Sequence, residues 1–179
     1  MEVEYIRDYA MYTGIFGMFS FMWFGWAQEN PRKSWRKYLG AASVLAMVVC
    51  LFGVYLSVTH WQEATALSVT TTFHRYIVFV WIEFFLAGIG AIVLLKRRLK
   101  EYVAPWIAFI VGIHFFWLTS IFQDGSLIVL GVLLTGTSLM SLPISRKLNV
   151  AASAVTGIGF GTLLFFFALS GLIRFLLAA

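Results

Sequence analysis

The sequence predicts an all-α integral membrane protein: one transmembrane domain over residues 1–179, with six helices in three hairpins and both termini outside. The first observation is composition, because 61% of the residues are hydrophobic and 12% are charged, whereas about 25% are charged in an average soluble domain. A water-soluble core of this size cannot hide so much apolar surface. The second observation is charge placement, because ten of the thirteen Lys and Arg residues fall in three short stretches between long apolar runs.

Six apolar stretches are long enough, or nearly so, to cross about 30 Å of hydrocarbon as a helix. They cover residues 9–27, 39–58, 73–95, 103–122, 126–142 and 150–177. Backbone polar groups in lipid must be satisfied within the segment, so helices are expected rather than open strands. The fifth stretch is short because Pro143 is expected to end it. Gly157 and Gly161, one helical turn apart on the sixth, are expected to mark a close helix contact.

The basic stretches fix an expected orientation. They lie between the first and second, third and fourth, and fifth and sixth spans, and positive turns of this kind face the cytoplasm. The net charge of +5 is therefore assigned to lipid headgroups rather than to nucleic acid. Asp8, Arg75 and Arg174 fall at the expected outer interface and are predicted to approach one another. Residues 62–69 of the longest outer loop are predicted to form an amphipathic lid or re-entrant segment.

Two ionisable side chains, Glu83 and His114, fall well inside predicted spans. The turn between the third and fourth spans is centred near residue 98.5, which is halfway between them. Equal distance from the turn of an antiparallel hairpin means equal depth, at about 1.5 Å rise per residue. A lone charged side chain at that depth costs at least about 2.5–3.5 kcal/mol, so a partner is expected. The pair is either a proton relay or ligand-binding site, or a buried hydrogen bond that fixes helix packing.

Three more residues complete the candidate ligand- or proton-binding site. Trp81 and Trp117 lie deeper than the aromatic residues that anchor helices at the membrane surface. Thr135 on the fifth span could add a hydroxyl to a shared polar centre. Its hydroxyl could equally bond to the backbone of its own helix, as Thr often does in apolar helices.

Motifs for enzyme chemistry are missing from the sequence. It holds no phosphate-binding loop, no Ser-His-Asp arrangement, no paired cysteines and no dinucleotide fingerprint. His60, Glu63 and His74 match no zinc-site spacing, so no metal site is assigned. No catalytic residue is assigned either, and the sequence does not indicate a cofactor. An enzyme acting on lipid would need a nucleophile or a metal set that the chain does not show.

Two segments carry a resemblance to known proteins. Residues 82–91 read IEFFLAGIGA and residues 105–116 read PWIAFIVGIHFF. They resemble a group of small uncharacterised bacterial six-span membrane proteins with a Glu on the third span and a Gly-x-His-Phe element on the fourth. The resemblance implies a multi-pass protein of the bacterial cytoplasmic membrane and points to Glu83 and His114. Trp117 stands where that group is expected to carry a proline, so a local bend does not carry over.

Two functional hypotheses follow. The first is small-molecule or proton-coupled transport or binding centred on the Glu83–His114 pair. The alternative is a non-catalytic interaction subunit, or a resistance or immunity factor, of a larger membrane assembly. The expected partners are the lipid bilayer, with a small ligand, a membrane protein or a second copy of the chain as further candidates.

Overall fold

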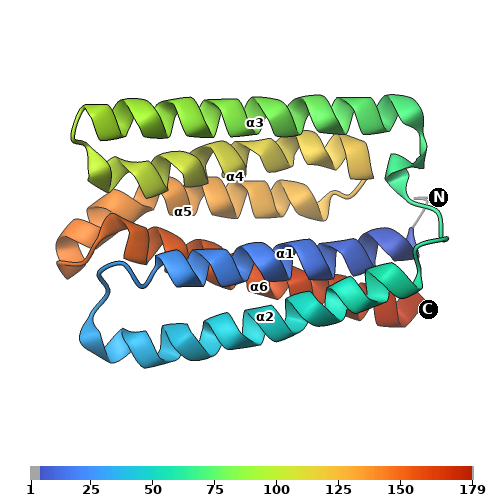
Figure 1. Ribbon diagram of the computed structural model, residues 1–179, viewed down its shortest axis with the longest axis horizontal. Helices are drawn as coiled ribbons and strands as arrows, with labels where there is room; N and C mark the ends of the chain where they lie inside the picture. The colour runs from blue at the N-terminus through green and yellow to red at the C-terminus, as the bar shows by residue number, and fades with distance from the viewer. Residues whose placement is uncertain (1–4, 179) are drawn as a thin grey trace.

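The computed structural model describes residues 5–178, and in this range the chain is helical with no strand (Figure 1). Its elements are α1 (Ile6–Trp26), η1 (Lys33–Trp35), α2 (Arg36–Thr59), η2 (Ala66–Ser68), α3 (Thr70–Lys96), η3 (Lys100–Tyr102), α4 (Val103–Phe122), α5 (Ser126–Leu148) and α6 (Ala152–Ala178). The predicted all-α class is confirmed, and each of the six predicted spans corresponds to one long helix.

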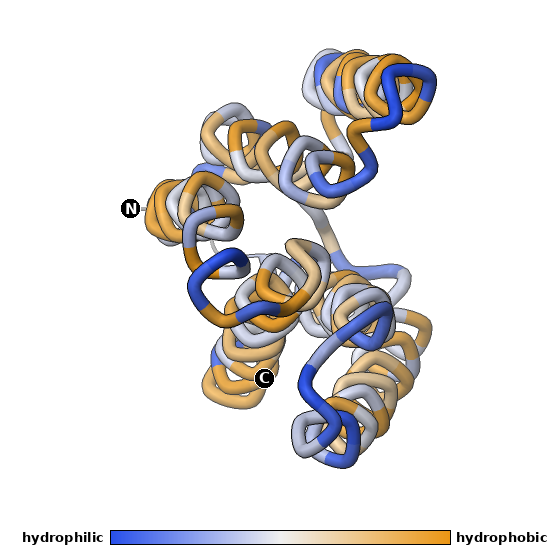
Figure 2. Tube along the Cα trace, turned by 90° about the vertical axis from the view of Figure 1, so that its left-hand side faces the viewer, coloured by the Kyte–Doolittle hydropathy of each residue, from blue (hydrophilic) through white to orange (hydrophobic). Residues whose placement is uncertain are grey.

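The six helices pack in the spatial order α2, α1, α6, α5, α4, α3. Both members of each predicted hairpin are neighbours, and contacts between α1 and α6 and between α4 and α5 join the hairpins. Helix α4 also touches α6, whereas α2 and α3 lie at the two edges of the bundle. Viewed along the helices in Figure 2, the hydrophilic turns lie over the ends of apolar helices.

The turns and the chain ends separate to opposite ends of the bundle. Figure 1 shows the α1–α2, α3–α4 and α5–α6 connections at one end, and the two ends of the chain at the other. The first group contains the three basic stretches, and this end is called the basic end below. The opposite end, called the terminal end, also holds the α2–α3 loop and the α4–α5 turn.

Five helical segments are long and apolar enough to cross a membrane, which indicates a multi-pass membrane protein. They are Lys33–Thr59, Thr70–Lys96, Lys100–Phe122, Ser126–Leu148 and Ala152–Ala178. The remaining long helix, α1, is not among these five. It lies between α2 and α6, and ten of its residues are buried by other parts of the protein.

The prediction that Pro143 ends the fifth span is wrong. Helix α5 continues through Pro143 to Leu148 and ends at Asn149, which adopts the left-handed conformation (φ 54°). A proline inside a helix removes one backbone N–H and its hydrogen bond, but the remaining turns can still form. Ser141 and Ser145, which flank the proline, donate side-chain hydrogen bonds to the carbonyls of Ser138 and Leu142 of the same helix.

Glycines allow α1 to approach both of its neighbours closely. A Cβ atom on Gly17 would lie 2.8 Å from the backbone nitrogen of Cys50 on α2. A Cβ atom on Gly53 would overlap the backbone of Gly14. On the other side of α1, a Cβ atom on Gly161 would lie 2.6 Å from the ring of Phe24. The predicted contact at Gly161 is therefore confirmed, and its partner is α1.

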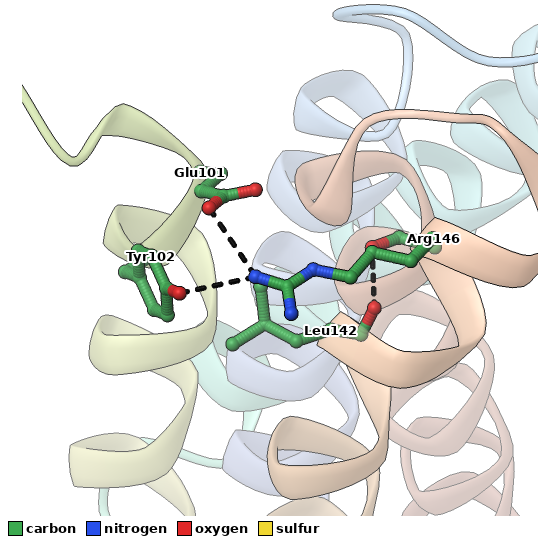
Figure 3. Close-up of polar contacts among 5 residues, drawn as sticks. Glu101, Tyr102, Leu142 and Arg146 are labelled. Carbon is green, nitrogen blue, oxygen red and sulfur yellow. Dashed lines mark hydrogen bonds and ion pairs between the residues drawn. The ribbon is translucent and has the colours of Figure 1, made fainter.

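Polar contacts join the hairpins at the basic end. The carboxylate of Glu29, after α1, binds Lys100 Nζ at 2.7 Å and accepts a hydrogen bond from the Ser153 hydroxyl at 2.7 Å. Figure 3 shows a second set, in which Arg146 of α5 reaches Glu101 at 3.4 Å and the Tyr102 hydroxyl at 3.1 Å. The first set joins η3 to the α1–α2 turn and the second joins it to α5, so the basic turns hold one another in place.

The α1–α2 contact predicts a difference between two glycines of α2. Gly53→Ala should lower the free energy of unfolding by about 1–3 kcal/mol, because the added methyl group meets backbone that cannot rotate away. Gly40→Ala should be neutral or stabilise by up to about 1 kcal/mol through helix propensity, because a Cβ atom there has no atom within 4 Å. Thermal or denaturant unfolding in detergent would measure both. Equal effects of the two substitutions would contradict the close contact.

The Glu29 contacts predict a pH dependence. Its hydrogen bonds from Lys100 and then Ser153 lower the pKa of the Glu29 carboxyl from the ordinary value of 4.5. A lowered folded-state pKa contributes stability that is complete above the unfolded-state pKa and is lost as the pH falls through the folded-state pKa. Glu29→Gln should therefore unfold at a slightly lower temperature than the native chain at pH 7. The difference should shrink below pH 4.5, and a difference that grows as the pH falls would contradict the assignment.

Candidate functional site

Glu83 lies at the middle of α3. Helix α3 runs from Thr70 to Lys96, so thirteen residues precede Glu83 and thirteen follow it. His114 lies near the middle of α4, with eleven residues before it and eight after it in Val103–Phe122. Of the Asp, Glu, Lys, Arg and His residues in the six long helices, these two alone are so far from a helix end. The chain therefore carries its two central ionisable groups on neighbouring antiparallel helices.

The two side chains meet. His114 Nδ1 lies 3.3 Å from Glu83 Oε2, and the side chains are 7% and 19% exposed, respectively. The predicted approach is confirmed. The atoms are close but not aligned for a hydrogen bond, and the buried Nδ1 has no hydrogen-bond partner among the described residues. A small rotation of either side chain would be enough to align them, since the distance is already within range.

The α3–α4 interface has a regular antiparallel register around this pair. One turn toward the terminal end, the rings of Phe79 and Trp117 stack with centroids 5.1 Å apart and an interplanar angle of 20°. Toward the basic end, Trp106 Nε1 donates a hydrogen bond to the Leu86 carbonyl at 3.2 Å. The indole of Trp106 occupies the space beside Gly90, where no Cβ atom would fit. Aromatic contacts therefore flank the Glu83–His114 pair on both sides.

The other predicted site residues are placed differently. Trp117 stacks on Phe79 one helical turn from the pair, and the residue is 42% exposed. Trp81 is 59% exposed and contacts Phe85 on its own helix, so it faces away from the pair. The Thr135 hydroxyl is buried on α5 beside Gly112 and has no hydrogen-bond partner among the described residues. Of the predicted site residues, the structure thus brings Glu83 and His114 together and places Trp117 one helical turn away.

Two cavities lie on the terminal side of the bundle. The smaller, about 60 Å³, lies between α1, α3 and α4 and is lined in part by Tyr76. Tyr76 is seven residues before Glu83, which places both on the same face of α3. The larger cavity, about 310 Å³, opens at the terminal end. Tyr12 and Phe122 line both cavities, so the two share a wall. Glu83 and His114 line neither.

Asp8, Arg75 and Arg174 were predicted to approach one another, and the structure does not pair them in this way. Arg174 Nη1 binds Asp124 Oδ2 at 2.7 Å, because the α4–α5 turn carries Asp124 over the end of α6. Asp8 lines the same cavity as Arg174 but uses its carboxylate elsewhere. Arg75 forms no ion pair within residues 5–178.

Asp8 holds the α2–α3 loop on α1. Its carboxylate accepts hydrogen bonds from the Thr65 hydroxyl and, at 2.9 Å, from the Ala66 backbone N–H. Arg7 adds a hydrogen bond to the Trp61 carbonyl at 2.8 Å and lies over the Trp61 ring. Within residues 62–69, the predicted lid, the structure has one short 3₁₀ turn, η2. Its Leu67 packs against the hydrophobic core that α1, α4, α5 and α6 form. The loop covers part of the terminal end, and the sequence held no signal for its attachment to Asp8.

The larger cavity was not predicted from the sequence. Its polar side chains come from α1, the α4–α5 turn and α6, which are far apart in the chain. The sequence did contain one indication of this cavity. The spacing of four and then three residues between Tyr5, Tyr9 and Tyr12 places these cavity-lining residues on one face of a helix.

Comparison with known proteins found no matching family model, no matching curated protein and no matching solved structure.

Proposed function

We propose that this chain is a six-span protein of the bacterial cytoplasmic membrane, with its basic end in the cytoplasm and its terminal end outside. The separation of the basic turns from the chain ends supports this topology, because Lys- and Arg-rich turns are retained on the cytoplasmic side. Helix α1 is the first of the six spans, and its partial burial between α2 and α6 lets it cross with fewer strongly apolar residues. The resemblance of residues 82–91 and 105–116 to bacterial six-span proteins supports the compartment.

The proposed activity is proton binding at the Glu83–His114 pair, coupled to transport or binding of a small molecule. The observation that carries it is the 3.3 Å approach of the two groups at the centre of α3 and α4. Ionisable groups at the middle of a membrane are costly and usually functional. If the pair served helix packing alone, two well-aligned neutral groups would be enough. Instead, Nδ1 of His114 has no hydrogen-bond partner among the described residues.

The chemistry of the pair is that of a proton site. With one proton to share, the pair is either a neutral carboxylic acid beside a neutral imidazole or a carboxylate beside an imidazolium, and its net charge is zero in both cases. A second proton makes the net charge +1. An uncompensated charge in a low-dielectric interior is costly, so protonation changes how strongly α3 is held against α4. Proton binding can in this way be coupled to movement of an edge helix.

A second candidate function is an interaction subunit, or a resistance or immunity factor, in a larger membrane assembly. The position of α3 favours it. None of the 27 residues of α3 is buried, and α4 is the one long helix against which it packs. A helix with so much free surface could be covered by another membrane protein instead of lipid. In that case the Glu83–His114 pair would fix helix packing and carry no proton.

The topology predicts opposite labelling of two engineered cysteines. In a Cys50→Ala background, Gln62→Cys in the α2–α3 loop should react with a membrane-impermeant maleimide added to intact cells. Ser34→Cys at the basic end should react only after the membrane is permeabilised, because the positive-inside rule places that turn in the cytoplasm. Labelling of Ser34→Cys in intact cells would reverse the proposed orientation.

The proton site predicts a loss of proton movement on removal of one titratable group. In proteoliposomes with a pH-sensitive dye inside, Glu83→Gln should reduce the protein-dependent proton flux at least about tenfold, because glutamine keeps the shape but does not titrate. Its thermal unfolding should stay close to that of the native chain, since a hydrogen-bonding side chain is retained. Glu83→Leu should lower both flux and stability.

Glu63→Gln serves as the matched control, because Glu63 is an exposed glutamate of the α2–α3 loop. It should leave the proton flux unchanged. The opposite outcome would be a native proton flux in Glu83→Gln and a loss of stability in Glu83→Leu but not in Glu83→Gln. It would show that the pair serves helix packing and would favour the interaction-subunit function.

A further inference from the structure

The surroundings of the Glu83–His114 pair differ toward the two ends of the bundle. Toward the basic end, residues 84–95 of α3 read FFLAGIGAIVLL and residues 103–113 of α4 read VAPWIAFIVGI. The one side chain with a polar atom in these two segments is Trp106. Its indole has a donor and no acceptor, and it uses the donor on the Leu86 carbonyl. Neither segment therefore has a side chain that could pass a proton to the pair from the basic end.

Toward the terminal end, the same two helices border the smaller cavity. This cavity, about 60 Å³, is lined in part by Tyr76 of α3 and by Leu118 and Phe122 of α4. Leu118 is four residues from His114, and Tyr76 is seven residues from Glu83. Both spacings keep the two residues on one face of their helix. The smaller cavity therefore lies directly on the terminal side of the pair.

Tyr76 brings a hydroxyl group to the side of this cavity that faces the pair. Its phenol lies within electrostatic reach of the Glu83 carboxylate. Seven residues of helix correspond to a rise of about 10 Å, so the carboxylate is too far away for direct proton transfer and close enough for transfer through water. A cavity of this size has room for water where polar groups can bind it. A phenol can both donate and accept a hydrogen bond, so Tyr76 can hold such a water.

Phe122, the last residue of α4, stands between the smaller cavity and the larger one. Its ring centroid lies 5.5 Å from that of Tyr12 and 6.2 Å from that of Tyr76, edge to face in both cases. The Tyr12 phenol lies within electrostatic reach of Asp8 and Asp124, which line the larger cavity. The Phe122 ring thus separates a tyrosine near the polar groups of the larger, open cavity from a tyrosine near the pair.

We propose that in this conformation protons reach the Glu83–His114 pair from the terminal end alone, through the larger cavity, past the Phe122 ring and across the Tyr76 hydroxyl. This inference rests on the proposed proton site and adds the route to it. The Tyr76 oxygen accepts a proton from a water on the cavity side while its own proton passes through a second water to the Glu83 carboxylate. The phenol is left unchanged, and the carboxylate becomes a carboxylic acid. Tyr76 is the positioning residue of the route, and Phe122 limits the entry of water.

The first test measures access to the smaller cavity and needs no proton flux. In the full chain with Cys50→Ala, Leu118→Cys places a thiol in the cavity wall. A methanethiosulfonate reagent with a trimethylammonium group, which reacts with thiols in water, is added to intact cells and to inverted membrane vesicles. Leu118→Cys should react from the side that labels Gln62→Cys. Adding Phe122→Ala should speed this reaction at least about tenfold, because loss of the ring leaves a space that joins the two cavities.

The matched control for access is Val111→Cys, which lies three residues from His114 on the basic side and on the same face of α4. It should react from neither side of the membrane, with or without Phe122→Ala. Reaction of Val111→Cys as fast as that of Leu118→Cys, reaction of Leu118→Cys from the basic side, or an unchanged rate in Phe122→Ala would each overturn the route.

The second test measures proton flux in proteoliposomes. Tyr76→Phe should reduce the flux at least about fivefold, because phenylalanine keeps the ring and removes the hydroxyl that passes the proton. Its thermal unfolding should stay close to that of the native chain. The matched control is Tyr55→Phe, since Tyr55 is 61% exposed on α2, away from the route, and it should leave the flux unchanged.

The outcomes separate this inference from the proposed function. Native flux in Tyr76→Phe, together with lost flux in Glu83→Gln, would overturn the route and leave the proton site standing. Equal losses in Tyr76→Phe and Tyr55→Phe would also overturn the route. Native flux in Glu83→Gln would defeat the proton site itself, whereas the labelling of Leu118→Cys does not depend on the flux.

Discussion

The close approach of α1 to α2 and α6 is the contact on which the rest of the bundle depends. Lipid gives no hydrophobic force between helices, so association relies on van der Waals packing and polar contacts across short distances. Gly17 and Gly53 bring the backbones of α1 and α2 together. On the other side of α1, the Ser20 hydroxyl donates to the Gly161 carbonyl at 2.7 Å. The three helices form the tightly packed half of the protein: ten residues of α1 are buried, while Met18, Phe19 and Met22 on its free face stay exposed.

Helix α3 shows the opposite arrangement. It is the most apolar of the five candidate spans and the least buried, and α4 is the one long helix against which it packs. Its interface depends on a few contacts: the Phe79–Trp117 stack, the Trp106–Leu86 hydrogen bond and the Glu83–His114 approach. In such a narrow interface one polar contact is a large share of the total. The pair therefore lies on the least buried of the candidate spans.

The sequence predicted the depth of side chains better than their direction. Glu83 and His114 could be paired because a short turn fixes the relative height of two antiparallel helices. Direction depends on helix rotation: Trp117 is three residues from His114 and shares its face, while Trp81 is two residues from Glu83 and points away. Arg174 was placed at the correct end, but its partner was missed because a turn elsewhere in the chain delivers Asp124. Pro143 was misjudged because a single missing N–H does not end a helix.

The central position of Glu83 has a consequence for how the chain enters the membrane. Helices are inserted in order as the chain is made, so in the proposed topology α3 reaches the bilayer before α4 and its His114 exist. A carboxylate at a helix centre opposes insertion by a few kcal/mol, while each Leu, Ile, Phe or Val favours it by about 0.3–0.6 kcal/mol. The many such residues of α3 are enough to offset one glutamate. In that topology Glu83 enters lipid without its partner and meets the imidazole only when the second helix of the hairpin follows.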